Sequence, residues 1–206
     1  MTLRNLLFLS LLLSFASCSN EKKASSETED FEEIDLVEED LSTVDSKKLL
    51  LEIDSLKNAA FASEKMKLNF SKQIIEDLIL SGVDLDASKR KAVEDAITQA
   101  NEKLYNDATL GDNDKMLAYD HSINDLIFAL KELEASVNGF EQYPRPAMLM
   151  GSINDATSRD IFTRGYYNGA VQKWNRMIVE YNDKVKKENP NIEIIEISYF
   201  YGEEPI

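Results

Sequence analysis

Apolar residues recur every three or four positions along most of the chain between residues 49 and 185. This spacing places them on one face of an α-helix, because the helix repeats every 3.6 residues. The pattern predicts four amphipathic helices, near residues 49–78, 86–104, 116–137 and 153–185. Long helices joined by short connections favour an all-α fold, an antiparallel up-down four-helix bundle.

Residues that typically begin or end helices stand between these stretches. Ser81-Gly82 and Asn138-Gly139 are expected to stop the first and third helices. Asp86 is a good N-cap, and Asp112-Asn113-Asp114 predicts a turn followed by an N-cap. Tyr143-Pro144-Arg145-Pro146 is expected to keep the third helix from continuing, because proline lacks the amide donor.

The C-terminal tail, residues 191–206, has a different pattern. Residues 192–201 combine high β-propensity with partial alternation, but they are too short to form a sheet of their own. We expect a short extended arm that packs on the bundle or is ordered by a partner. Tyr199, Phe200 and Tyr201 are the candidate partner surface on this arm.

The first residues predict a lipoprotein signal peptide, residues 1–17. Arg4 is the only charge before Cys18, an apolar run follows it, and the small residues Ala16 and Ser17 precede the cysteine. The apolar run of about ten residues is too short to cross a bilayer core of roughly 30 Å. Phe15-Ala16-Ser17-Cys18 resembles a bacterial lipobox, which implies lipidation of Cys18 and attachment to the membrane.

Cys18 is the only cysteine in the chain, and other roles have to be weighed against lipidation. A lone cysteine is most often a small buried hydrophobic residue, but this one precedes any plausible core. It cannot form a disulfide within one chain. Simple secretion and an uncleaved anchor remain the alternatives.

Residues 18–46 are expected to be a disordered acidic tether that begins at the lipidated cysteine. Acidic residues crowd into positions 27–40, together with serine and threonine, and such a segment buries too little apolar surface to fold. A solvated spacer is favoured over an acidic docking segment. The helical domain is then expected to span residues 47–190.

The formal net charge of the chain is −15. A surface of that sign repels nucleic acid, so we exclude nucleic acid as a partner. The lipobox, not the charge, favours a location in the bacterial cell envelope, facing the periplasm or the cell exterior. The choice between the inner and outer membrane stays open.

One stretch of the fourth helix carries a family resemblance. Residues 167–175 read YNGAVQKWN, which resembles the Tyr-Asn-x-Ala-Val-x-x-Tyr-Asn run of the LemA family. Arg159 and Arg164 also lie where that family carries arginines, and Tyr143-Pro144 is similar to its Tyr-Pro between helices. The resemblance covers roughly residues 60–188. It implies a membrane-anchored helical bundle outside the cytoplasm, and it implies no established activity.

The same motif can be interpreted from helix geometry alone. Tyr167, Val171 and Trp174 lie on the apolar stripe, so we expect them to pack in the core. Asn168 and Asn175 are two helical turns apart and share one edge, where they can hydrogen-bond a neighbouring helix or loop. Packing is favoured over ligand binding.

The residue pattern offers no catalytic or metal-binding constellation. A di-iron bundle needs Glu-x-x-His pairs, but the single histidine, His121, follows Ala118 by three positions. Because His121 lies beside Asp120 and off the apolar stripe, we expect it to be solvated. Asp112-Asn113-Asp114 lacks the glycine and glutamate of a calcium loop. We therefore expect no metal, no cofactor and no enzymatic activity.

Three functions remain open at this point, and the weakest of them is a purely structural envelope spacer with no dedicated partner. The first is a lipid-anchored, non-catalytic scaffold or adaptor that binds another envelope protein. The alternative is a carrier that encloses a lipid or peptide between its helices, for which the small residues Ala59, Ala60, Ala96 and Ala100 could line the space.

Overall fold

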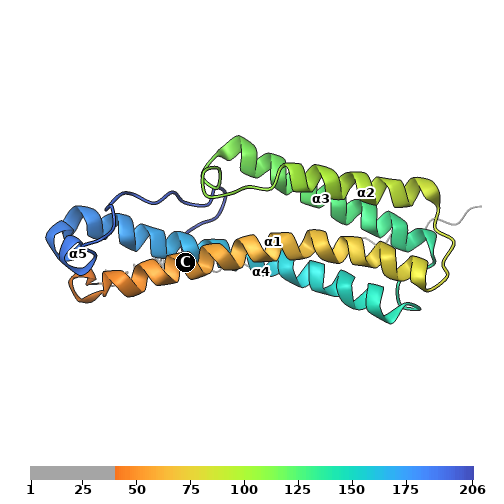
Figure 1. Cartoon of the computed structure of the whole chain (residues 1–206), viewed down its shortest axis with the longest axis horizontal. Coiled ribbons are helices and arrows are strands. Elements are labelled where there is room, and N and C mark those ends of the chain that lie inside the picture. The colour runs from red at the N-terminus through yellow and green to blue at the C-terminus, as the bar shows by residue number, and fades with distance from the viewer. Residues whose placement is uncertain (1–39) are drawn as a thin grey trace, which may run out of the picture. The chain divides into compact units, whose positions relative to one another are not determined.

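The structure, a computed structural model, describes residues 40–206 (Figure 1). Within this range the chain forms five α-helices, a short 3₁₀ helix and no strand, which confirms the all-α prediction. The elements are η1 (Leu41–Thr43), α1 (Ser46–Leu80), α2 (Ala87–Glu102), α3 (Asn113–Ser136), α4 (Pro144–Glu180) and α5 (Asn182–Glu188).

Two long helices form the spine of the domain. α1 packs along α4, α2 packs along α3, and α2 also contacts α1. In Figure 1 the α2–α3 hairpin lies over one half of the α1–α4 pair, and the C-terminal tail follows the other half of α4. The tail therefore occupies the part of α4 that the hairpin leaves uncovered.

Side-chain caps explain where α1, α2 and α3 begin. The Asp45 carboxylate accepts hydrogen bonds from the Lys47 and Lys48 amides at the start of α1. Asp86 and Asp112 cap α2 and α3 in the same way, as the sequence predicts. Each cap satisfies amide donors that the first helical turn leaves without a partner.

The fourth helix differs from its predicted bounds at both ends. It begins at Pro144 rather than near residue 153, because a proline in the first turn sacrifices no helical hydrogen bond. Tyr143-Pro144-Arg145-Pro146 thus starts a helix as well as separating two helices. The predicted continuous helix to residue 185 is also wrong, since the chain breaks at Tyr181 and α5 follows.

The folded unit also begins earlier than the predicted boundary after residue 46. Leu41 is only 2% exposed and belongs to the core, and Asp40 caps the short helix η1. The described helical unit therefore includes residues 40–46, which were predicted to belong to the acidic tether. The signal segment, Cys18 and residues 19–39 lie outside the described residues.

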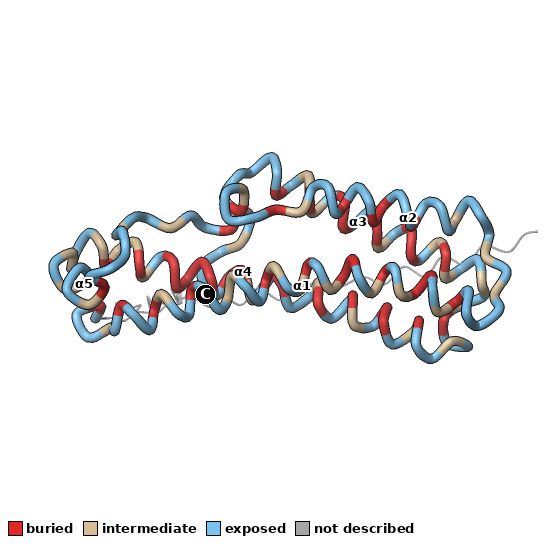
Figure 2. The backbone as a smooth tube through the Cα atoms, in the orientation of Figure 1, coloured by how far each residue is buried: buried red, intermediate tan, exposed pale blue. Residues whose placement is uncertain are grey.

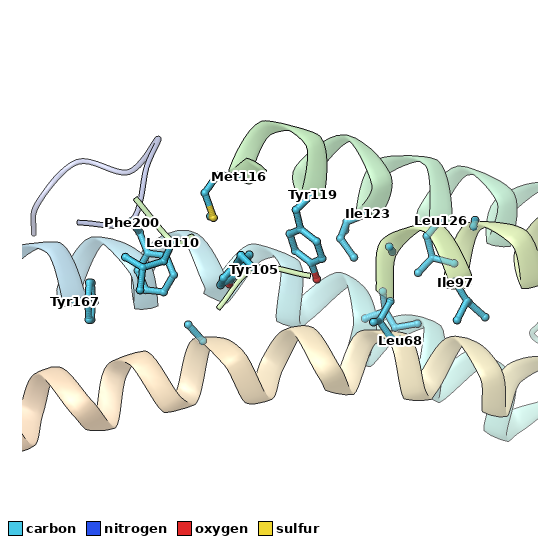
Figure 3. Close-up of a cluster of buried hydrophobic side chains, with 14 of the residues drawn as sticks. Leu68, Ile97, Tyr105, Leu110, Met116, Tyr119, Ile123, Leu126, Tyr167 and Phe200 are labelled. Carbon is cyan, nitrogen blue, oxygen red and sulfur yellow. The ribbon is translucent and has the colours of Figure 1, made fainter. Parts of the chain in front are cut away.

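The buried residues form one continuous core along the facing sides of the helices (Figures 2 and 3). Leu68 of α1, Ile97 of α2 and Leu126 of α3 meet on the hairpin side. Near the tail, the core changes to aromatic residues, among them Tyr105 and Phe200. The opposite helix faces are exposed, and no helix within residues 40–206 is long and apolar enough to span a membrane.

Two glycines provide a matched test of the helix boundaries. Gly139 has a φ of 98°, a conformation that side chains with a Cβ avoid, and an added Cβ would also collide with the Glu141 carboxylate. Gly139→Ala should therefore lower the free energy of unfolding by about 1 kcal/mol. Gly151→Ala, inside α4 with open space around it, should raise it by roughly 0.5–1 kcal/mol.

Urea denaturation of both variants measures these differences. Opposite signs are the expected result. Equal destabilisation by the two substitutions would contradict the placement of one glycine in a turn and the other within a helix.

Candidate functional site

The YNGAVQKWN motif lies in the C-terminal half of α4, where the helix meets the tail. Tyr167, Val171 and Trp174 are almost completely buried. Asn168 is buried and Asn175 is half-buried, and both face the tail rather than another helix. The motif therefore combines core packing with recognition of a neighbouring segment.

The two asparagines bind the main chain of the tail in the same way. The Asn175 amide donates to the Ile197 carbonyl and accepts from the Ile197 amide, both at 2.9 Å. The Asn168 amide donates to the Phe200 carbonyl at 2.9 Å and accepts from the Phe200 amide at 2.8 Å. Each side chain thus pairs with one residue as a neighbouring strand would, which satisfies polar groups that would otherwise be buried without partners.

Aromatic residues of the same motif add two further hydrogen bonds to the tail. The Trp174 indole donates to the Ile195 carbonyl at 3.0 Å, and the Tyr167 hydroxyl donates to the Ser198 carbonyl at 3.0 Å. At the end of the chain, the Ile206 amide donates to the Gly165 carbonyl at 3.1 Å. Side chains at Gly165 and Gly169 would collide with Ile206, so these glycines make room for the C-terminus.

Phe200 holds the tail in the core and cannot serve as an exposed partner surface. It is 1% exposed and packs between Phe61, Tyr105 and Tyr167, with ring centroids 4.7–6.3 Å away. The prediction of an exposed Tyr199–Phe200–Tyr201 surface is therefore wrong at its central residue. Of the two neighbours, Tyr199 is exposed and Tyr201 is half-buried.

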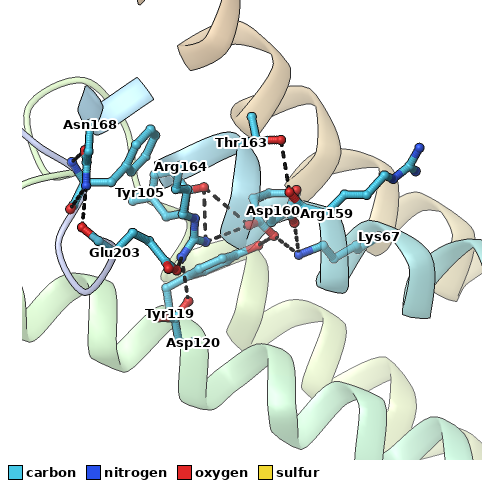
Figure 4. A network of polar contacts seen from close by, with 12 residues as sticks. Lys67, Tyr105, Tyr119, Asp120, Arg159, Asp160, Thr163, Arg164, Asn168 and Glu203 are labelled. Atoms are coloured by element: carbon cyan, nitrogen blue, oxygen red, sulfur yellow. Dashed lines mark hydrogen bonds and ion pairs between the residues drawn. The ribbon is translucent and has the colours of Figure 1, made fainter. Parts of the chain in front are cut away.

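Arg164 belongs to a buried network of charges centred on Glu64 (Figure 4). Glu64, in the middle of α1, has no exposed surface. Its Oε2 atom accepts a hydrogen bond from the Tyr119 hydroxyl and pairs with Lys67 Nζ, both at 2.7 Å. Its Oε1 atom accepts from Arg164 Nη2 at 2.8 Å and from the Tyr105 hydroxyl at 3.3 Å. One carboxylate thus connects α1, α3, α4 and the α2–α3 loop.

Further acidic groups extend the network toward the surface. Lys67 also forms an ion pair with Asp160 of α4. Arg164 Nη1 lies 3.4 Å from Asp120 of α3 and 3.9 Å from Glu203 of the tail. Carboxyl groups outnumber the two cations in this cluster, so acidic groups dominate the charge around it.

The environment shifts the pKa values of two carboxyl groups in opposite directions. Burial alone would raise the pKa of Glu64, but the charges of Lys67 and Arg164 outweigh burial, and the pKa lies below its ordinary value. Burial, together with the charge of Glu64, raises the pKa of Asp160 even though Lys67 is close. The folded chain therefore favours ionised Glu64 and disfavours ionised Asp160.

A pocket of about 190 Å³ opens beside this network. Residues of α1, α3, α4 and the tail line it, including Asn124, Thr157 and Ile161. Both oxygens of Glu64 are already bound by cations and hydroxyl groups, so Glu64 itself is not free to act as a general base. Its geometry supports a role in holding the helices together.

The remaining candidate residues lie apart from this network. Arg159 is exposed on α4, and its carbonyl accepts a hydrogen bond from the Thr163 hydroxyl at 3.1 Å. His121 is exposed on α3. Within residues 40–206, no group of three or more histidine, cysteine or acidic side chains is arranged to hold a metal ion.

Sequence reasoning missed Glu64 and Lys67 because they occupy core positions of α1. The apolar stripe predicted for this region passed through Met66 and Phe70, which are only half-buried. Glu64, Lys67 and Ser71 face inward there, together with Leu68. Their spacing of three and four residues, in step with Ala60 and Ile74, is the signal that could have identified them.

Comparisons with protein-family models, with curated proteins and with solved structures gave no match to this chain. The resemblance to the LemA family thus rests on the sequence motif, and function has to be argued from the structure.

The two shifted carboxyl groups lead to a paired prediction. Glu64→Gln should lower the free energy of unfolding by about 3 kcal/mol at pH 7, because it leaves Lys67 and Arg164 buried with less compensating charge. Asp160→Asn should cost much less or stabilise the fold, since the folded state already disfavours the charge on Asp160. Denaturant titrations between pH 3 and pH 8 measure both effects.

The pH dependence separates these variants further. The stability that Glu64 contributes is present above its ordinary pKa of 4.5 and is lost as the pH falls through its lower folded-state pKa. The difference between wild type and Glu64→Gln should therefore shrink only in acid. The penalty from ionised Asp160 should begin to decrease as the pH falls through its raised folded-state pKa and should be gone below the ordinary value of 3.8. A Glu64→Gln penalty that does not change with pH would contradict this interpretation.

Proposed function

We propose that this protein is a non-catalytic scaffold or adaptor of the bacterial cell envelope that is anchored by lipid on Cys18 and binds another envelope protein. An exposed apolar patch on α4 supports this proposal most directly. The patch consists of Ile161, Phe162, Tyr166 and Ile206, each about half exposed.

The members of the patch are neighbours on the surface. Ile161, Phe162 and Tyr166 lie within two turns of α4. Ile206 fills the space over Gly165, where its Cδ1 atom would be 2.6 Å from an added Cβ. Single exposed apolar residues are ordinary on protein surfaces, but a contiguous group beside charged residues is typical of an interaction site. We place the partner surface here rather than on the Tyr199–Tyr201 arm.

The state of the buried charges supports a binding role over a catalytic one. Arg164 and Lys67 are engaged with carboxylates inside the protein, and Glu64 has no exposed surface. Groups held in this way fix the relative positions of the helices.

We further propose that the domain is a variant of the antiparallel up-down four-helix bundle and a diverged relative of the LemA family. The reversal of direction between successive long helices supports the first point (Figure 1). The YNGAVQKWN motif at residues 167–175 supports the second. In this variant the tail packs along the C-terminal half of α4, which the α2–α3 hairpin leaves uncovered.

The alternative role, a carrier for a lipid or peptide between the helices, has less support. Ala60, Ala96 and Ala100 are buried within the continuous core and make close helix contacts there. Close packing of small residues explains them without an enclosed ligand.

Lipid anchoring and partner binding can be tested separately. Metabolic labelling with a palmitate analogue, followed by membrane fractionation, should detect lipid on the native chain. Cys18→Ala should lose both the label and stable membrane attachment, because the lipid provides the anchor. An unlabelled native chain, or a Cys18→Ala chain that remains in the membrane fraction, would contradict the proposed anchor.

Site-specific photo-crosslinking tests the patch. A crosslinking amino acid at Phe162 should capture a discrete envelope protein in intact cells, and mass spectrometry identifies it. The same amino acid at Val179, which is exposed farther along α4, is the matched control. Phe162→Asp should abolish capture from a crosslinker at Ile161, because a charge on the patch opposes apolar docking. Equal capture at Phe162 and Val179 would contradict this surface.

A further inference from the structure

The contacts between α4 and the tail depend mainly on the main chain of the tail. Trp174, Asn175, Tyr167 and Asn168 direct their hydrogen bonds to peptide groups of residues 195–203. Such bonds do not read the side chains of the bound segment, as when an extended peptide is added to the edge of a sheet. We call this surface of α4, together with Gly165 and Gly169, the tail-binding face.

Two features give the tail-binding face its specificity. The Phe200 ring fills a buried aromatic site beside Tyr105 and Tyr167. Ile206 is seated against Gly165 and Gly169, where larger residues would collide with it. The face therefore suits an extended segment that carries a buried aromatic residue and, a few positions later, a residue seated over the two glycines, which is what this chain's own tail provides.

The segment that joins the tail to α5 takes no part in these bonds. The contacts with the motif begin at Ile195, whereas residues 190–193 are exposed. The α5 helix ends at Glu188, so a short exposed connection precedes the bound segment. The same hydrogen bonds and the same aromatic packing are available whichever copy of the chain supplies the tail.

We propose that the tail-binding face is a peptide-binding site that also accepts the tail of a second copy of this chain, giving exchanged dimers. The hydrogen bonds and packing contacts of the tail are the same in the two arrangements. The equilibrium between monomer and exchanged dimer therefore depends on the entropy of closing the connection and on the protein concentration. A short connection gives the chain's own tail an effective concentration in the millimolar range. Exchange is therefore expected when copies are concentrated, independently of the partner proposed above.

Engineered cysteines can detect exchange directly in the full chain. An ideal Cβ on Gly111, in the turn before α3, lies 3.2 Å from Cβ of Ser198 in the tail, close to the separation that a disulfide spans. With Cys18→Ala in every chain, the double variant Gly111→Cys/Ser198→Cys should close within one molecule. A mixture of the two single variants forms the same disulfide efficiently when the tail of one copy lies on the other, and random collision sets the background.

The mixture should give a disulfide-linked dimer several-fold more abundantly than a control mixture of Ser198→Cys with Lys131→Cys, an exposed site on α3. Yields equal to the control, while the double variant closes internally, would overturn the proposal. Failure of the double variant to close would overturn the docked position on which the proposal rests.

Asn175→Ala should change the yield of the disulfide-linked dimer in opposite directions, depending on which of the two chains carries it. Asn175→Ala on the Gly111→Cys chain weakens the receiving face and should lower the yield. Asn175→Ala on the Ser198→Cys chain releases that chain's own tail and should raise the yield. Equal effects from the two placements would overturn the exchange, because random collision has no such asymmetry.

Light scattering of the chain with only Cys18→Ala provides a measurement without engineered thiols. The dimer fraction should rise as the concentration approaches about 1 mM, where a second copy competes with the attached tail. A chain that remains monomeric up to that concentration would also overturn the proposal.

Discussion

A single buried carboxylate, that of Glu64, controls how the segments of this domain meet. It lies midway along α1 and accepts interactions from Lys67, Arg164 and two tyrosine hydroxyls. A charge without these partners would cost several kcal/mol in the interior, so α3, α4 and the α2–α3 loop must place their donors around it. Apolar packing alone tolerates many alignments of long helices, whereas this arrangement of donors and acceptors selects one register.

The tail depends on the same region. Arg164 lies over the rings of Tyr105 and Phe200, with its Cζ atom 5.2 and 5.8 Å from their centroids. Through these contacts the buried charge, the aromatic cluster and the C-terminal segment form one continuous unit. The hairpin and the tail thus cover the two halves of the α1–α4 spine, and the network lies where they meet (Figures 1 and 4).

Much of the fold could be predicted because it depends on local pattern. Helical periodicity identified the long helices, and Asp86 and Asp112 marked two of their starts. The start of α4 was predicted too late because Tyr143-Pro144-Arg145-Pro146 was interpreted only as a break, although proline also suits a first turn. The charged core positions of α1 were missed because Glu64 and Lys67 interrupt the apolar stripe, and the partners that allow their burial are distant in the sequence.

The sequence by itself determined the helical class, most helix ends and the shared edge of Asn168 and Asn175, because each follows from the geometry of a single helix. Only the tertiary structure decided what those asparagines bind and which charges are buried. Asn168 recognises a residue 32 positions away, and Arg164 reaches a carboxylate 100 positions away. No local periodicity records such pairings, because they arise only when distant segments are brought together by the burial of their common apolar surface.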